Sequence, residues 1–563
     1  MDTGSLNDLW SQTLVAGFAA AGVRHAVISP GSRSTPLALA LLRQPAIACR
    51  VVIDERCAAF VALGIAKASG VPALVLGTSG SAPGHWLPAV IEADRAAVPL
   101  ILVSADRPCE LQACGANQTV DQSGLFTGLL RDRHLLESPH PDFAAGWLHR
   151  LAARAVETSC WPLAGPVQVN QPFREPLLPG NDAVPTLAPL PAMRIHRPIP
   201  GAPASETVAA VAATVAGAPG VIVCGAMAGP GGDPAFPSAL TDLARKLACP
   251  VIAEPLANLR FGPHDRGLVC GHQDRWLRRD DFVATHRPTW VLRFGEFPVN
   301  RRLQVFASQA PEVIVVEERP RWNDPAHTVG TLVRSEPAAF CRALAAALPP
   351  IARPDWIAAY ATAEAEAKAA LATLPLPAEA RVVQAIVAAV PAGAAVFIGN
   401  SLPIRDVDSF SGSSGKAIEF FANRGVSGID GNLSTAAGIA AVRGPTLALL
   451  GDLACQHDLG GLAALRGLPA VVVVINNGGG GIFDHLPQAG LAEFERGWLT
   501  PQGIDFAAAA ATFGLEYRAV PDLGNFGQVL DAAVASGTPV LIEVRVDRAA
   551  SRAGREAWWT ISR

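Results

Sequence analysis

The chain has 563 residues, of which 50% are hydrophobic and 17% are charged, and its formal net charge is −4. This composition excludes an intrinsically disordered protein, and the length suits three or four domains. With a pI near 6.3, the charge gives no basic surface for nucleic acid or for an anionic membrane. Any anionic ligand must therefore be bound by local arginines.

No apolar run approaches the roughly 20 residues that a transmembrane helix needs. The segment Met1–Trp10 contains Asp2 and Asp8 and lacks the basic and apolar stretches of a signal peptide. The ten cysteines form no Cys-x-x-Cys pair and no His/Cys cluster at zinc spacing. We therefore expect a cytoplasmic protein without a membrane partner.

The first third of the chain alternates short apolar segments with helical patterns, which is typical of β-α-β units around a parallel sheet. The segments expected to be strands are Ala26–Ser29, Cys49–Ile53, Ala73–Leu76, Leu100–Ser104 and Val167–Asn170. Nine prolines from Pro172 to Pro203 then predict a stiff, extended connection.

The same alternation returns twice. The expected strands are Val221–Cys224, Val251–Ala253, Trp290–Phe294 and Val313–Val316, and then Ala395–Gly399, Ile418–Ala422, Thr446–Gly451, Ala470–Asn476 and Val540–Val546. An alanine-rich helix before Pro375 separates the two sets. The pattern predicts an α/β fold with three doubly wound parallel-sheet domains, at residues 1–180, 205–348 and 375–563.

Polar side chains follow two strands of the third domain. One strand ends in Gly451-Asp452, and 25 residues after Asp452 another ends in Asn476-Asn477 and a glycine run. In a doubly wound sheet ligands bind outside the carboxyl ends of the strands, where these oxygens suit Mg²⁺ with a bound phosphate. Either half alone would favour an ordinary turn, but the two together predict a metal site that holds a diphosphate.

Two features of the first domain have open interpretations. Arg33 lies at the start of a predicted helix, where it is either part of an anion site or a solvated arginine beside Ser32, Ser34 and Thr35. Glu55 follows a strand and precedes a long apolar helix, so it is either a catalytic carboxylate or a charge partner of the helix N-terminus.

Motifs of the first and third domains together resemble the thiamine diphosphate enzymes, and among them the branch that acts in menaquinone biosynthesis. The motifs are SPGSRSTPLALAL, DERCAAF, ADRPCEL, GANQTVDQ, GNSLPIRDVD, NRGVSGIDGNLSTAAG, GDLACQHDLGGL and INNGGGGIF. The resemblance is weak in the middle domain. It implies thiamine diphosphate with Mg²⁺, or Mn²⁺, as cofactors, and 2-oxoglutarate and isochorismate as substrates. The implied reaction is decarboxylation of 2-oxoglutarate with conjugate addition of the carbanion to isochorismate.

The resemblance also implies roles for individual residues. Glu55 would bind a ring nitrogen of the cofactor's aminopyrimidine and promote the tautomer that acts as base. The implied metal ligands are Asp452, Asn477 and the carbonyl of Gly479. Other implied cofactor contacts are Gly451, Leu453, Ile429, Ile482 and Phe483. The implied substrate residues are Ser32, Arg33, Arg107 and Gln118 on one side and Ser401, Arg405 and Arg424 on the other, with Arg301 and Arg302 as a less secure basic pair.

Several positions depart from the family pattern. Leu453 stands where the family has glycine after the metal aspartate, and Ser81, Gly84, His85 and Gly481 also differ. These changes remove no catalytic group, but they leave open a drifted preference for the acceptor substrate.

Glu55 and the metal motif lie on different domains, and in the family such a site crosses between subunits. The resemblance therefore implies a homodimer or homotetramer. The alternatives are an acetolactate synthase-like enzyme, a simple 2-oxoacid decarboxylase or a silent thiamine-binding protein. A nicotinamide dehydrogenase is disfavoured because the chain lacks a persuasive G-x-G-x-x-G motif after a first strand.

Overall fold

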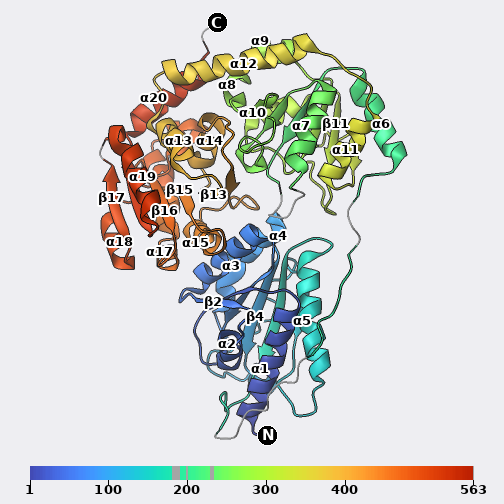
Figure 1. Ribbon diagram of the computed structural model, residues 1–563. Helices are drawn as coiled ribbons and strands as arrows, with labels where there is room; N and C mark the ends of the chain where they lie inside the picture. Colours follow the sequence, from blue (N-terminus) through green and yellow to red (C-terminus); the bar gives the residue numbers. More distant parts are fainter. Residues whose placement is uncertain (181–189, 198–200, 228–233, 521, 562–563) are drawn as a thin grey trace. The chain divides into compact units, whose positions relative to one another are not determined.

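The computed structural model describes residues 1–180, 190–197, 201–227, 234–520 and 522–561. It contains three six-stranded sheets, and their strand pairs are parallel (Figure 1). The predicted α/β class with three parallel sheets is confirmed.

The chain forms two compact units. The first contains Met1–Arg197, Asn423–Gly444 and His457–Leu468, and the second contains Pro198–Ala422, Pro445–Gln456 and Pro469–Arg563. The first unit thus combines the N-terminal sheet with two segments from the last third of the sequence.

The N-terminal sheet has the strand order β2-β1-β3-β4-β6-β5. Its strands are β1 (His25–Ile28), β2 (Ala48–Val51), β3 (Ala73–Gly77), β4 (Leu100–Asp106), β5 (Asp132–Leu135) and β6 (Pro166–Pro172). The helices of this region are α1 (Thr3–Ala20), α2 (Thr35–Leu42), α3 (Glu55–Ser69), α4 (Leu87–Ala96) and α5 (Ala145–Cys160). Helices α1, α2 and α5 share one apolar core with the sheet, while α3 packs against α4.

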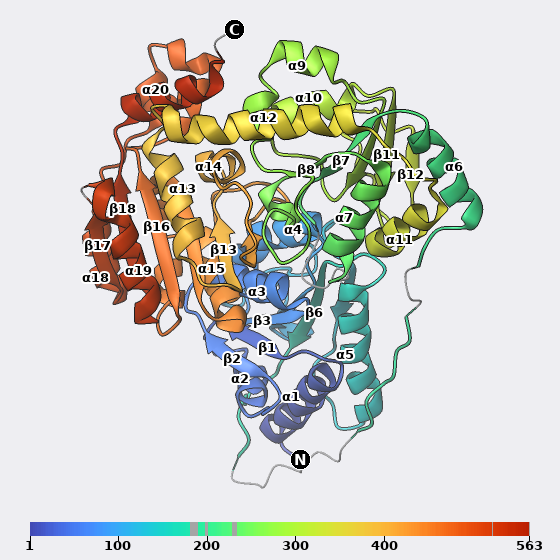
Figure 2. The ribbon, with the colours of Figure 1, turned by 45° about the horizontal axis from the view of Figure 1, so that its top comes forward.

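The central sheet has the order β12-β11-β10-β7-β8-β9, which is the order of dinucleotide-binding folds. Its strands are β7 (Gly220–Cys224), β8 (Val251–Ala253), β9 (Val269–Cys270), β10 (Trp290–Phe294), β11 (Glu312–Val316) and β12 (Thr331–Val333). The helices are α6 (Ser205–Ala216), α7 (Phe236–Leu247), α8 (Gln273–Trp276), α9 (Asp280–Thr285), α10 (Arg301–Ser308), α11 (Pro337–Ala347) and α12 (Pro354–Thr373). Figure 1 shows α12 running past α8, which it contacts, toward the C-terminal sheet, and Figure 2 shows α12 in a second view.

The C-terminal sheet has the order β14-β13-β15-β16-β18-β17, which repeats that of the N-terminal sheet. Its strands are β13 (Ala394–Ile398), β14 (Ile418–Phe421), β15 (Thr446–Gly451), β16 (Ala470–Asn476), β17 (Glu516–Val520) and β18 (Val540–Arg545). The remaining helices are α13 (Ala378–Ala389), α14 (Leu402–Phe410), α15 (Asn432–Arg443), α16 (Asp452–His457), α17 (Gly461–Ala464), α18 (Phe506–Phe513), α19 (Phe526–Ser536) and α20 (Arg548–Trp559). The strand order reverses between β13 and β15, so the carboxyl ends of these strands are the expected ligand site.

Four strands were not predicted: β5, β9, β12 and β17. All four lie at sheet edges. Strands β5 and β17 have the sequences DRHL and EYRAV, which contain no continuous apolar run because an edge strand is only partly buried. The prediction relied on buried apolar segments, and it therefore missed β5 and β17.

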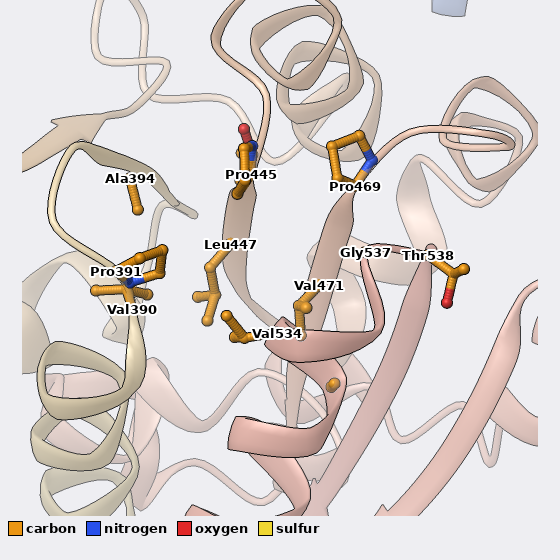
Figure 3. A pocket seen from close by; sticks show the side chains of 12 residues that line it. Val390, Pro391, Ala394, Pro445, Leu447, Pro469, Val471, Val534, Gly537 and Thr538 are labelled. Carbon is orange, nitrogen blue, oxygen red and sulfur yellow. The ribbon is translucent and has the colours of Figure 1, made fainter.

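A cavity of about 40 Å³ opens beside the C-terminal sheet (Figure 3). It is lined by Ala394, Leu447 and Val471, which lie at the amino ends of β13, β15 and β16, and by Pro445 and Pro469. Because cofactors bind at the carboxyl ends in such sheets, this cavity is not the expected cofactor site.

In the described part of the chain, no single helix combines the length and apolar character needed to cross a bilayer, although the bent pair α12 and α13 together meets that test.

Candidate functional site

Asp452 lies directly after β15, where the strand order of the C-terminal sheet reverses. Its side chain is buried, with Oδ1 accepting a hydrogen bond from the Leu453 N–H at 2.9 Å and Oδ2 accepting one from the Gly479 N–H at 2.7 Å. Burial raises the pKa of the Asp452 carboxyl to about 6, against the lowering effect of these backbone donors. The structure thus brings the Asp452 carboxylate and the Gly479 loop together.

Asn476, the last residue of β16, and Asn477, the next residue, have different surroundings. Asn476 donates to Glu543 at 2.7 Å and accepts from the Gly478 N–H at 3.1 Å. In contrast, Oδ1 of Asn477 is buried and has no hydrogen-bond partner among the described residues. A buried amide oxygen without a donor is costly unless a ligand satisfies it, so Asn477 fits a cation.

The glycine run after Asn477 is shaped by close contacts. Gly479 has φ +137°, and a Cβ there would lie 2.1 Å from the Leu499 carbonyl oxygen. A Cβ at Gly481 would lie 2.6 Å from Nδ2 of Asn477. Glycine at position 481, where the family has a different residue, therefore leaves room for the Asn477 amide. Ile482 and Phe483 follow in a short 3₁₀ helix and are half-buried.

Ser401 precedes α14 at the neighbouring end of β13. It adopts φ +75°, an unusual value for a residue other than glycine, and its carbonyl oxygen accepts a hydrogen bond from the Arg405 guanidinium at 2.6 Å. Backbone strain of this kind is found at binding sites that the surrounding structure holds in place.

Two buried ion pairs hold α14 in place. Asp406 pairs with Arg555 of α20, and Asp408 pairs with Arg260 at 2.5 Å. Arg260 is fully buried and also donates to the Asp408 carbonyl oxygen. These contacts tie α14, which follows Ser401, to α20 and to the segment that carries Arg260, and no sequence pattern predicted them.

In the first unit, Glu55 is the first residue of α3 and is half-buried. Asp54 caps this helix by accepting hydrogen bonds from the N–H groups of Arg56 and Cys57. Glu55 is therefore not needed as the helix cap, which leaves its carboxylate available for a ligand.

The segment that follows α16 holds the first turn of α3. The carboxylate of Asp458 is fully buried and accepts hydrogen bonds from the Ser434 N–H at 2.7 Å, the Ser434 hydroxyl at 3.1 Å and the Cys57 thiol at 3.6 Å. Arg56 lies 3.9 Å from the same carboxylate. Asp458 thus joins the start of α3 to the start of α15.

Arg33 is buried just before α2. It donates to the Phe173 carbonyl oxygen at 3.0 Å and to the exposed Glu175 carboxylate at 2.9 Å, while its Nε is buried without a partner among the described residues. Ser34 is the N-cap residue of α2, but its hydroxyl donates to Gly31 instead of capping the helix. The interpretation of Arg33 as a solvated arginine is therefore wrong.

Arg107 and Gln118 meet at Ser79, in the turn after β3. Arg107 donates to the Ser79 hydroxyl, and Gln118 donates to the Ser79 carbonyl oxygen at 3.0 Å. Burial lowers the pKa of Arg107, and the nearby charge of Arg33 lowers it further. Two neighbouring guanidinium groups at the carboxyl ends of the strands form a site suited to a carboxylate.

The remaining predicted residues lie in loops or at the starts of helices. Arg424 and Ile429 lie in the loop between β14 and α15 and are half-buried, so Ile429 is not a core residue. Ser32 is exposed, and its carbonyl oxygen accepts hydrogen bonds from Thr35. Arg301 and Arg302 are exposed at the start of α10, next to the Asn300 cap.

Two regions of the chain match models of known protein families. Residues 10–125 match the N-terminal TPP binding domain of thiamine pyrophosphate enzymes, and residues 414–544 match the C-terminal TPP binding domain of the same enzymes. Together with the sheets and the polar residues at their carboxyl ends, these matches define a thiamine pyrophosphate enzyme.

Relatives named 2-succinyl-5-enolpyruvyl-6-hydroxy-3-cyclohexene-1-carboxylate synthase match almost the whole chain. The protein of Dechloromonas aromatica is 50% identical over 97% of this chain and 99% of its own length. Those of Chloroflexus aurantiacus and Geobacillus kaustophilus are 38% and 39% identical, over 96% and 99% of this chain and 93% and 98% of their own lengths. The chain belongs to this synthase family of thiamine diphosphate-dependent transferases.

Proposed function

We propose that the protein decarboxylates 2-oxoglutarate and adds the resulting carbanion to isochorismate, giving the product named in its relatives, as a step of menaquinone biosynthesis. One carbon–carbon bond breaks to release CO₂, and one forms between the remaining four-carbon unit and the ring of isochorismate. Bound thiamine diphosphate would supply the electron sink that stabilises the carbanion.

The observation that supports this proposal most strongly is the buried, unpartnered Oδ1 of Asn477 beside the Asp452 loop. Asp452, Asn477 and the Gly479 carbonyl would hold Mg²⁺, or Mn²⁺, against the diphosphate of the cofactor. One carboxylate, one amide and one carbonyl leave octahedral positions for phosphate and water oxygens. Gly451, Leu453, Ile482 and Phe483 adjoin these ligands in the sequence and would contact the cofactor.

The Glu55 carboxylate would hydrogen-bond to the aminopyrimidine ring and hold the proton there. Its availability supports this role, because Asp54 already caps α3. Ile429 would pack between the two rings of the cofactor.

The arginines would bind the substrate carboxylates. Arg33 and Arg107 are close enough for one to lower the pKa of the other, so an anion between them would be stabilised by both. Ser32 and Gln118 would complete that side of the pocket, and Ser401, Arg405 and Arg424 would line the other side. Arg301 and Arg302 would be the basic pair that the family resemblance implies.

We further propose a homodimer or homotetramer with domains at residues 1–180, 205–348 and 375–563. All ten cysteines have free thiols, which supports a reducing compartment such as the cytoplasm.

The test is a coupled assay of isochorismate consumption with 2-oxoglutarate, with thiamine diphosphate and Mg²⁺ each present or omitted. We expect one CO₂ for each isochorismate consumed and no turnover when either cofactor is missing. Release of a semialdehyde at the same rate with and without isochorismate would instead identify a 2-oxoacid decarboxylase.

A further inference from the structure

A buried ion pair joins α3 and α4 in the first unit. Nζ of Lys67, in the last turn of α3, lies 2.9 Å from Oε1 of Glu92 on α4, and the two residues are 8% and 2% exposed. Removing two charges from water is costly, so such a pair adds little stability unless further hydrogen bonds satisfy both groups.

Further hydrogen bonds from both residues reach one loop, between β14 and α15. Glu92 accepts hydrogen bonds from the N–H groups of Gly425, at 3.0 Å to Oε1, and Val426, at 2.9 Å to Oε2. Lys67 donates to Oδ1 of Asn423 at 3.1 Å, and the Asn423 amide donates to the Thr435 hydroxyl. The ion pair therefore holds the chain immediately before and immediately after Arg424.

The loop also approaches α4 closely. A Cβ at Gly425 would lie 2.8 Å from the carbonyl oxygen and from Oε2 of Glu92. Glycine at this position allows the loop backbone to reach the carboxylate directly.

We infer that Lys67 and Glu92 are positioning residues that fix the backbone on both sides of Arg424, and so set how this arginine meets a substrate carboxylate. The inference rests on the proposed function, because it takes Arg424 to bind substrate. Neither residue belongs to a motif of the family resemblance, and neither is itself assigned to the substrate pocket.

The variant Glu92→Gln tests this role. A glutamine keeps the size of the side chain, but its NH₂ group would face an N–H of the loop, and Lys67 would lose its counterion. We expect KM for the substrate bound by Arg424 to rise about 10- to 100-fold, with kcat changed less than about threefold, because the loss concerns binding and not the chemical step.

The matched control is Asp94→Asn, on the same helix. Asp94 pairs with Arg131 at 2.6 Å, and both side chains are mostly buried, but this pair does not bind the Arg424 loop. We expect this variant to lower the thermal midpoint without raising KM. A similar KM in the two variants would show that Glu92 has only a structural role.

A double-mutant cycle with Arg424→Ala separates the two claims. If Glu92 acts through Arg424, the double variant should have the KM of Arg424→Ala alone, whereas multiplicative effects would refute the positioning role. An inactive wild-type protein would refute the proposed function instead. In that case amide hydrogen exchange still tests the contact: Gly425 and Val426 should exchange faster in Glu92→Gln and not in Asp94→Asn, and equal rates would overturn the inference.

Discussion

Asn476, at the end of β16, and Asn477 are adjacent in sequence but have different surroundings. The Asn476 side chain is hydrogen-bonded to Glu543 and Gly478, whereas Oδ1 of Asn477 is buried without a donor among the described residues. Asn476 ends β16 and donates to Glu543 of the neighbouring strand β18, while Asn477 begins the glycine loop. Only Asn477 is therefore suited to a metal.

This difference gives a matched pair of variants. We expect Asn477→Ala to weaken Mg²⁺-dependent binding of thiamine diphosphate by more than about 100-fold, because loss of a ligand should exceed the 10- to 100-fold effect of losing a supporting residue. Asn476→Ala should weaken it less than about tenfold. Calorimetric titration measures both, and equal losses would contradict the assignment of Asn477 as the ligand.

Motifs predicted the residues at the strand ends but not the residues that support them. Asp452, Asn477 and Arg107 follow strands directly, and Arg33 lies between β1 and α2, so their positions could be inferred from strand order. Glu175 and Glu92 could not be found in this way, because a hydrogen bond between segments distant in the sequence leaves no local pattern.

At the scale of elements, α3 and α15 pack with their backbones in close contact. A Cβ at Gly64 of α3 would lie 2.1 Å from the Thr435 carbonyl oxygen, and one at Gly438 of α15 would lie 2.1 Å from the Val61 carbonyl oxygen. The sequence predicted the helix after Glu55, but it could not predict that this helix packs against α15. Their contact links the helix that begins at Glu55 to the loop that carries Arg424 and Ile429.

The variant Gly438→Ala should push these helices apart. We expect the free energy of unfolding to fall by about 1–3 kcal/mol, the usual cost of overpacking, and the thermal midpoint to fall with it. Gly146→Ala in α5 is the control, because a Cβ there has no neighbour within 4 Å. An unchanged midpoint in Gly438→Ala would contradict the close packing of α3 and α15.

The contact between α3 and α15 should also depend on pH through Asp458. Burial raises the pKa of this carboxyl from 3.8 to about 6. Between these values the folded protein holds a proton that the unfolded chain has released, so this group's contribution to stability is fully present below about pH 4 and is lost as the pH rises through 6.

The variant Asp458→Asn removes this titration. The free energy of unfolding of Asp458→Asn minus that of wild type should increase between pH 5 and pH 7. The total increase should stay within about 3 kcal/mol, because a shift of about two pKa units corresponds to that free energy, and the difference should be constant above pH 7. Thermal unfolding of both proteins across this pH range measures this difference. If the free energies of unfolding of the two proteins change in parallel from pH 5 to pH 8, Asp458 does not titrate in that range.

At the scale of the whole molecule, the first and last sheets share one strand order and the central sheet has another. The sequence predicted the three parallel sheets because their inner strands are continuous apolar runs. It did not predict that Asn423–Gly444 and His457–Leu468 join the compact unit of the N-terminal sheet. That arrangement depends on hydrogen bonds such as those between Ser434 and Asp458, which the spacing of apolar residues does not predict.

The central claim is that Asp452 and Asn477 of one copy hold the metal and diphosphate while Glu55 of a second copy binds the pyrimidine. Two inactive variants, Glu55→Gln and Asp452→Ala, test it when they are produced together with different affinity tags. Random pairing makes about half of the dimers mixed, and one of the two sites in each mixed dimer then has both residues intact, so about a quarter of wild-type turnover should return. No recovery of turnover, in preparations where both tags are present in the same assembly, would contradict the claim.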